Sequence, residues 1–398
     1  MPFSAPEPPQ RLLTRDFVKL VLTQMAFGYA ISTFMLLPKF LATQLHGNAA
    51  EIGHVNAIPG LIAALLVPFV GGALDRFGRK PLLQLGSALG VVYALLWLTV
   101  DRVGPAVYGL QVLCGAAFML TFSGTSTLVA DAAPPARLGQ AIGIFGAANI
   151  SMNALAPGVA EPLAERMGWW IAFALAAGMF ALAFLLSFRL REQRRAAVPA
   201  SAGDLRDTLI VARRLFPYIA AMLSCGAAFG ASFTFYQPYV LAQGADHVSS
   251  FFVGFMLAAV GTRLGLGGVA DRVGRRRVAL IALTAYACMV LAMVQLTPER
   301  LLLFGFGFGL AHGFFFPALN AYALEFTAPH ERGRAMTLVN GSFHLGNTTS
   351  LLCCGYVANT YGYPLAFALA ASIAGLGVCA LHWDQLLSTR LLAVRSQV

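Results

Sequence analysis

The chain has 398 residues, of which 58% are hydrophobic and only 11% are charged. Soluble domains carry about 25% charged residues, so this composition excludes a cytoplasmic enzyme, a disordered scaffold and a secreted disulfide module. The 27 Lys and Arg residues outnumber the 17 Asp and Glu residues, for a formal net charge of +10; in so apolar a chain this excess indicates membrane topology rather than nucleic-acid binding.

Twelve long apolar runs follow one another along the chain, each near the roughly 20 residues that a membrane-spanning helix requires. They cover residues 17–41, 50–73, 81–100, 105–130, 138–162, 169–189, 215–242, 249–270, 278–297, 300–326, 336–358 and 364–383. Continuous runs of this length favour helices, because the strands of a transmembrane barrel give short alternating segments. The sequence therefore predicts an all-α membrane protein with twelve transmembrane helices.

The distribution of cationic residues predicts the orientation. With the N-terminus inside, the great majority of the Lys and Arg residues lie in cytoplasmic loops, and only Lys39, Arg102, Arg166 and Arg300 lie outside. The positive-inside rule then places both termini in the cytoplasm. The polar N-terminal stretch lacks the features of a cleaved signal peptide, so we expect an integral protein of the plasma membrane, in bacteria the inner membrane.

An internal repeat divides the chain into two halves. The segment GGALDRFGRK at 71–80 returns as GGVADRVGRR at 267–276. The longest polar break, at about 190–214, separates six runs from six. We therefore predict an N-terminal six-helix bundle (residues 1–189), a cytoplasmic linker (190–214) and a C-terminal six-helix bundle (215–398). Parallel repeats of this kind are typical of secondary transporters.

The repeated segment resembles the loop signature G-x-x-x-D-(R/K)-x-G-R-(R/K) of the major facilitator superfamily, which has two pseudo-symmetric six-helix bundles. Its positions are filled by Gly71, Asp75, Arg76, Gly78, Arg79 and Lys80 in the first copy and by Gly267, Asp271, Arg272, Gly274, Arg275 and Arg276 in the second. The resemblance implies that this cluster latches the cytoplasmic side in the outward-open state. Glycines permit close approach there, and arginines form strong bonds to carboxylates.

Acidic residues at two helix ends are the expected partners of the latch. Asp131 and Arg137 flank the end of the fourth run, and Glu325 and Arg332 flank the end of the tenth. The alternative is that all of these are ordinary interfacial charges.

Two departures weaken a further resemblance to drug–proton antiporters of the family. Gln111 stands four residues before Gly115, where many exporters have an arginine. The segment APGVAEP at 156–162 replaces the paired glycines of the antiporter pattern in the fifth run.

Arg263 is the conspicuous charge within a predicted span. It lies eight residues before Asp271, or roughly 12 Å inside the cytoplasmic boundary. A buried guanidinium requires a partner. The candidates are an anionic group of a substrate, a structural pair with Glu325, or snorkelling of the side chain toward the cytoplasm.

Other polar residues in the spans are candidates for substrate or coupling contacts. They are Asn340, His344 and Asn347 in the eleventh run, Asn149 and Asn153 in the fifth, and His312 in the tenth. The alternative for the amides is interhelical hydrogen bonding, and for His312 a neutral hydrogen-bonded ring instead of a proton carrier. Glu161, near the outer end of the fifth run, is expected to be interfacial, which leaves no mid-membrane carboxylate.

Aromatic residues line one face of the predicted seventh and fourth spans. Phe229, Phe233, Tyr236 and Tyr239 share a face of one, and Gln111, Phe118 and Phe122 share a face of the other. Such walls suit an amphipathic organic molecule, although helix packing alone also places aromatic residues there.

The leading hypothesis is a secondary transporter, not an enzyme, that exports a small organic solute by alternating access, with protons as a candidate coupling ion. An uptake permease for an anionic metabolite is the alternative, and a non-transporting membrane receptor is a remote one. No phosphate-binding loop and no catalytic or metal motif is apparent, so we expect no cofactor and no metal. The expected partners are the solute and the bilayer, and the expected unit is a monomer.

Overall fold

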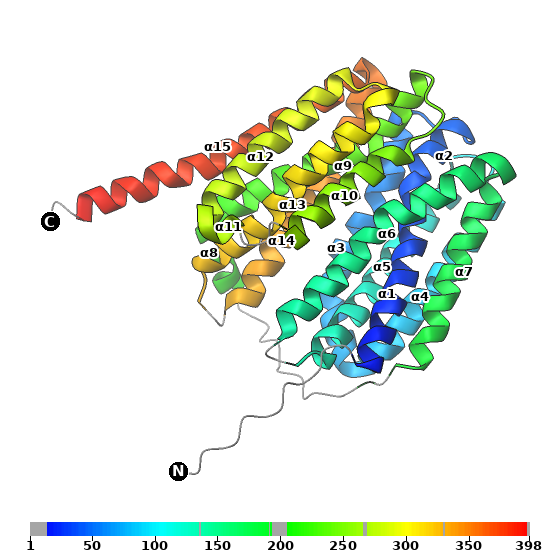
Figure 1. Ribbon diagram of the computed structural model, residues 1–398, viewed down its shortest axis with the longest axis horizontal. Coiled ribbons are helices and arrows are strands. Elements are labelled where there is room, and N and C mark those ends of the chain that lie inside the picture. Colours follow the sequence, from blue (N-terminus) through cyan, green and yellow to red (C-terminus); the bar gives the residue numbers. More distant parts are fainter. Residues whose placement is uncertain are drawn as a thin grey trace, which may run out of the picture.

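The computed structural model (Figure 1) describes residues 14–134, 137–190, 192, 205–265, 269–328 and 331–395. Every regular element in these residues is a helix. The first half contains α1 (Arg15–Thr33), η1 (Phe34–Leu36), α2 (Leu37–Thr43), α3 (Ala49–Phe77), α4 (Arg79–Leu96), η2 (Trp97–Thr99), α5 (Pro105–Ala132), α6 (Leu138–Met167) and α7 (Trp169–Phe188). The rest contains α8 (Leu205–Arg214), α9 (Phe216–Ala242), α10 (Ser249–Gly265), α11 (Val269–Val273), α12 (Arg275–Ala292), η4 (Met293–Gln295), η5 (Pro298–Arg300), α13 (Leu301–Glu325), α14 (Arg332–Tyr361) and α15 (Tyr363–Arg395).

The predicted fold class, an all-helical membrane protein, is confirmed. Ten helical segments in the described residues are long and apolar enough to cross a bilayer, and each of the twelve predicted runs overlaps a helix. The two that fall short are α10, whose apolar part is only Ser249–Arg263, and α14, whose 30 residues include the polar Asn340, His344 and Asn347. That these two also span the membrane stays a prediction.

Four glycines join consecutive helices without a loop. Gly78, Gly168, Gly274 and Gly362 have φ angles of 94°, 94°, 102° and 92°, a region that side chains with a Cβ rarely adopt. They end α3, α6, α11 and α14, and the next helix starts at the following residue. The same device therefore turns the chain at matching places in both halves, which agrees with the sequence repeat.

Each half packs mainly on itself. In the first half α1 contacts α5, α6 and α7, while in the second α9 contacts α14 and α15. The halves meet where α3 packs on α14, α6 on α10 and α2 on α9. Figure 1 shows the two groups of helices side by side, diverging toward the end where α1 and α14 begin. The division at 190–214 stays a prediction, because much of that segment lies outside the described residues.

The seam between α3 and α14 is tight only in its outer half. A Cβ on Gly53 would lie 2.3 Å from the backbone oxygen of Leu351, and one on Gly60 would lie 2.6 Å from Oγ1 of Thr348. The backbones therefore touch there, which glycine alone permits.

Further toward the predicted cytoplasmic side, the same two helix faces are exposed. At 100° per residue, Val67 and Gly71 lie within about 40° of Gly53 on α3. Thr337, Gly341 and His344 likewise continue the α14 face that meets α3. All five are exposed, so the two helices are in close contact at one end of the seam and apart at the other.

Replacing Gly53 should therefore open the outer side. In Gly53→Leu the added side chain collides with the α14 backbone, and overpacking of this kind costs about 1–3 kcal/mol. That shifts the balance of conformations about fivefold or more. Spin labels at His46 and Thr360, both exposed at the outer ends, should move apart. Gly178→Leu on α7, where a Cβ meets nothing within 4 Å, is the control. Equal distances between the two spin labels in both variants would contradict the close packing of α3 on α14.

Candidate functional site

A central pocket of about 210 Å³ lies between the two halves, directly inside the closed outer end. None of the residues that line it is charged. Its polar side chains come from both halves, and aromatic rings fill much of the remaining wall. The lining consists of Ile31, Phe34, Met35, Leu37, Pro38, Asn56, Pro59, Tyr93, Gln111, Cys114, Phe229, Gly230, Phe233, Thr234, Asn347 and Leu351.

Three amides supply hydrogen-bonding groups to this pocket. Gln111 is 1% exposed, and its Oε1 lies 3.5 Å from the hydroxyl of Tyr93. Asn56 donates from Nδ2 to the oxygen of Ile52 at 2.8 Å, which leaves its own oxygen available. Oδ1 of Asn347 lies so close to Gly230 that a Cβ there would be 2.4 Å away. Amides both donate and accept, so the pocket can bind an uncharged polar group.

The predicted aromatic wall is partly in this pocket. Phe229 and Phe233 stack with their ring centroids 4.1 Å apart, and Phe34 lies 4.4 Å from Tyr93. Tyr236 does not line the pocket, and its hydroxyl instead donates to the backbone oxygen of Val248 at 2.9 Å.

Charged residues close the pocket on its outer side. The ammonium of Lys39 donates to Oε1 of Glu161 at 2.6 Å, to Oε1 of Glu165 at 2.7 Å and to the backbone oxygen of Asp246 at 2.6 Å. Lys39 and Glu161 have side-chain exposures of 7% and 0%. An ion pair this buried is destabilised by desolvation unless every charge is well paired.

Glu161 also reaches across to the other half. Its two carboxylate oxygens each accept one backbone N–H, from Val248 and Ser249, both at 2.7 Å. These amides form the N-terminus of α10, where the helix dipole favours an anion. A carboxylate of α6 thus holds a helix of the second half against the first.

Two further contacts complete the outer gate, which we define as Lys39, Glu161, Glu165, Gln237 and His247. Nε2 of Gln237 donates to the oxygen of Met35 at 2.8 Å, and its Oε1 accepts the backbone N–H of Lys39 at 3.2 Å. Nδ1 of His247 lies 2.9 Å from Glu165. Glu161, Glu165 and His247 are close enough together to hold a metal ion, but the Lys39 ammonium already supplies the cation.

The outer gate is the part of the site that the sequence analysis missed. The prediction that Glu161 is interfacial is wrong, since it is fully buried. Arg263 is likewise not the only charged residue that lies within a predicted membrane span. A signal was present: Lys39 and Glu161 lie within apolar runs, at the same predicted side of the membrane, with opposite charges.

On the predicted cytoplasmic side, the latch residues form ion pairs within each half. Nε of Arg79 lies 2.7 Å from Asp131, and Nη1 of Arg275 lies 3.1 Å from Glu325. Each pair joins the start of one helix to the end of another in the same half. The backbone N–H of Arg79 also donates to Glu192 at 2.7 Å.

The remaining latch residues make few contacts in this conformation. Arg137 and Arg332 are exposed, Arg76 lies over the Phe77 ring, and a Cβ on Gly71 would meet nothing within 4 Å. The side chains of Asp75 and Asp271, together with Gly267, lie outside the described residues. The latch role therefore stays a prediction, and no latch contact between the halves is seen among the described residues.

The other predicted amides and histidines fall in different places. Asn149 accepts from Gln24 and Asn153 accepts from Ser32, both at 2.8 Å, so these two tie α6 to α1. The buried oxygen of Asn340 has no hydrogen-bond partner in the described part of the chain. His344 is exposed on the α14 face of the seam.

His312 lies behind the aromatic wall. Its ring centroid is 5.4 Å from that of Phe229 and 5.6 Å from those of Phe255 and Phe316. Its buried Nδ1 has no hydrogen-bond partner among the described residues.

Arg263 is partly buried on α10 and forms no hydrogen bond or ion pair with the residues that the structure describes. The alternative pairing with Glu325 is not observed, because Glu325 contacts Arg275 instead.

The helical membrane fold, the uncharged central pocket and the one-sided closure define a membrane transporter for a small molecule. The family model described as Major Facilitator Superfamily matches residues 20–267 and 245–389. The chain belongs to this superfamily.

Individual relatives agree with that assignment. The multidrug resistance protein MdtG of Salmonella typhimurium is 26% identical over 384 residues, covering 92% of this chain and 93% of that protein. The nucleoside transporter NupG superposes with a TM-score of 0.75 at 16% identity, over 93% of this chain and 98% of that one. The POT family transporter PepTSo gives 0.73 at 11% identity, over 94% and 98%. These two structures share the fold.

The outer gate predicts unequal effects of its charges on stability. In Lys39→Met the buried carboxylate of Glu161 loses its cation, which typically costs about 3 kcal/mol. Glu165→Gln should cost less than about 1 kcal/mol, because Glu165 is 31% exposed and solvent screens its charge. Thermal unfolding of purified protein measures both.

A double variant separates the ion pair from general damage. Lys39→Met combined with Glu161→Gln should unfold at a higher temperature than Lys39→Met alone, since no unpaired charge remains buried. A double variant less stable than both single variants would contradict the pairing.

Proposed function

We propose that this transporter exports a small organic solute by alternating access and that the conformation described here is its inward-open state. The observation that carries the proposal is the contrast between the two sides of the central pocket. On the outer side the Lys39–Glu161 pair and the α10 N-terminus close it. On the other side the α3 and α14 faces are exposed, so a solute can enter from the cytoplasm.

The outer gate is suited to repeated opening. Lys39 and Glu161 both belong to the first half and can remain paired when the halves separate. Opening breaks the contacts of Glu161 with the two α10 amides, of Lys39 with Asp246, of Gln237 with Met35 and the Lys39 backbone, and of His247 with Glu165. Water can replace each of these hydrogen bonds, so opening costs far less than separating the buried ions would.

Export is favoured over uptake by the relatives. The chain aligns over nearly its whole length with a protein whose name describes multidrug resistance. An uncharged pocket of amides and aromatic rings suits an amphipathic organic solute. We further propose that the protein works as a monomer in a bacterial inner membrane with both termini inside, and that protons are the coupling ion.

The proton proposal is tested with proteoliposomes. His312 and His344 are its candidate carriers. If either couples protons to transport, adding solute should change the internal pH as the solute crosses. A constant internal pH during measurable flux would contradict coupling and leave uncoupled export.

The pocket is tested by a ligand screen that monitors thermal unfolding, because a ligand that binds only the folded state raises the midpoint. For a ligand so found, Gln111→Leu and Asn347→Leu should each weaken binding about tenfold, since each leaves a polar group of the ligand unpaired. Thr284→Val, which removes an exposed hydroxyl on α12, is the control. Unchanged affinity in both amide variants would place the solute elsewhere.

Uptake of an anionic metabolite is the second candidate, and Arg263 favours it. For an anionic ligand, Arg263→Ala should abolish detectable binding, whereas Arg277→Ala, which removes an exposed charge at the start of α12, should not. Wild-type affinity in Arg263→Ala would rule out this role of the guanidinium.

A further inference from the structure

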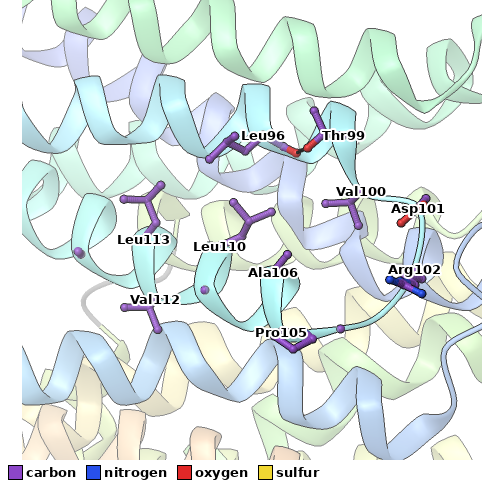
Figure 2. Close-up of a pocket in the computed structure, with 13 residues that line it drawn as sticks. Leu96, Thr99, Val100, Asp101, Arg102, Pro105, Ala106, Leu110, Val112 and Leu113 are labelled. Atoms are coloured by element: carbon purple, nitrogen blue, oxygen red, sulfur yellow. Dashed lines mark hydrogen bonds between the residues drawn. The ribbon is translucent and has the colours of Figure 1, made fainter.

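An open groove of about 730 Å³ lies on the first half (Figure 2) and shares no lining residue with the central pocket. It is formed by the end of α4, the connection at 100–104 and the first half of α5. Its volume is within the range of about 300–1,000 Å³ that ligand sites occupy. The lining residues are Leu96, Thr99, Val100, Asp101, Arg102, Gly104, Pro105, Ala106, Gly109, Leu110, Val112, Leu113 and Ala116.

The body of the groove is apolar, and its length along α5 is close to the thickness of one leaflet of a bilayer. Leu96 and Val112 are 42% and 44% exposed, and at this position in a membrane-spanning bundle they face lipid. From Pro105 to Ala116 helix α5 rises about 16 Å. This is close to half of the roughly 30 Å thickness of the hydrocarbon core. An acyl chain that lies along α5 would therefore fit from the membrane surface to the bilayer centre.

The mouth of the groove carries one anion and one cation. Asp101 and Arg102 lie at one end, and Leu113 and Val112 lie toward the other (Figure 2). Both charged side chains are exposed, and neither forms an ion pair within the part of the chain described here. The hydroxyl of Thr99 already donates to the backbone oxygen of Leu96 at 2.8 Å, so the free polar groups are the two charges.

We propose that this groove binds a phospholipid whose headgroup carries both a phosphate and a primary ammonium. Arg102 binds the phosphate through charge-assisted hydrogen bonds, Asp101 accepts from the ammonium, and one acyl chain fills the groove. A headgroup with a phosphate alone would satisfy Arg102 but leave Asp101 facing a second anion. A quaternary ammonium would be attracted to Asp101 but has no N–H to donate.

The connection at 100–104, which carries Asp101 and Arg102, also packs against the outer end of the first half. Val103 packs against the α2–α3 connection, where its Cγ2 would lie 3.3 Å from a Cβ on Gly47. A lipid bound to Asp101 and Arg102 would therefore brace the segment next to the outer gate. This inference does not depend on the direction of transport or on the solute.

The test measures lipid binding to the purified full-length chain by native mass spectrometry. Phosphatidylethanolamine, phosphatidylcholine and phosphatidylglycerol with identical acyl chains are titrated separately. We expect phosphatidylethanolamine to bind about three- to tenfold more tightly than the other two. Equal affinity for the three lipids, or a preference for phosphatidylglycerol, would overturn the proposal.

Two charge variants assign the headgroup contacts. Arg102→Ala should weaken all three lipids, whereas Asp101→Asn should remove the preference for phosphatidylethanolamine over both of the other lipids. Glu299→Gln and Arg300→Ala provide the matched controls, because this acidic–basic pair is exposed at the corresponding connection of the second half and does not line the groove. Equal losses in the controls would show nonspecific surface attraction and overturn the assignment.

A third variant tests the groove itself. Gly109 lines it, and a Cβ there would meet nothing within 4 Å. Gly109→Leu should therefore fold, fill the groove and weaken every lipid about tenfold while the two charges stay in place. Unchanged binding in Gly109→Leu would contradict an acyl chain in the groove, even if the charge variants proved too unstable to purify.

Discussion

A carboxylate buried between helices must be neutralised and hydrogen-bonded, and the closed outer side of this transporter depends on how Glu161 meets that requirement. Its partners are the Lys39 ammonium from its own half and two backbone amides of α10 from the other half. The first contact removes the penalty of the buried charge. The second uses the remaining lone pairs to hold the halves together. Closure therefore depends on one charge that is permanently paired within one half and only conditionally bonded to the other.

The seam between α3 and α14 also holds the two halves together at the outer side. Gly53 and Gly60 let α3 approach α14 in the outer half, and the exposed His344 and Thr337 mark where that approach ends. Because the halves are packed internally, they can rotate against each other without repacking their cores. The Arg79–Asp131 and Arg275–Glu325 pairs fit this picture, since each joins two helices at the end of one half opposite the outer gate.

The fold was largely predictable, because long apolar runs, cationic loops and a repeated loop segment are local features of the sequence. The turns at Gly78 and Gly274 follow from that repeat. Gln111 and Asn347 were candidates because polar residues within spans are rare, and both line the pocket. The outer gate was not predicted, because Glu161 and the start of α10 lie far apart in sequence, and only the packing of α6 on α10 brings them together. A carboxylate near a predicted helix end looks the same in sequence whether it faces lipid headgroups or a buried lysine.

The most direct test of this account uses Cys114, which lines the central pocket and is 6% exposed, in a variant whose other cysteines are replaced by alanine. A membrane-impermeant maleimide is added to vesicles of either orientation. The account predicts that Cys114 reacts faster from the side that carries the chain termini. It also predicts that Glu161→Gln, which weakens the hold on α10, raises labelling from the opposite side about tenfold. Labelling of Cys114 that is equally fast from both sides in the protein with Glu161 intact, and unchanged in Glu161→Gln, would contradict the account.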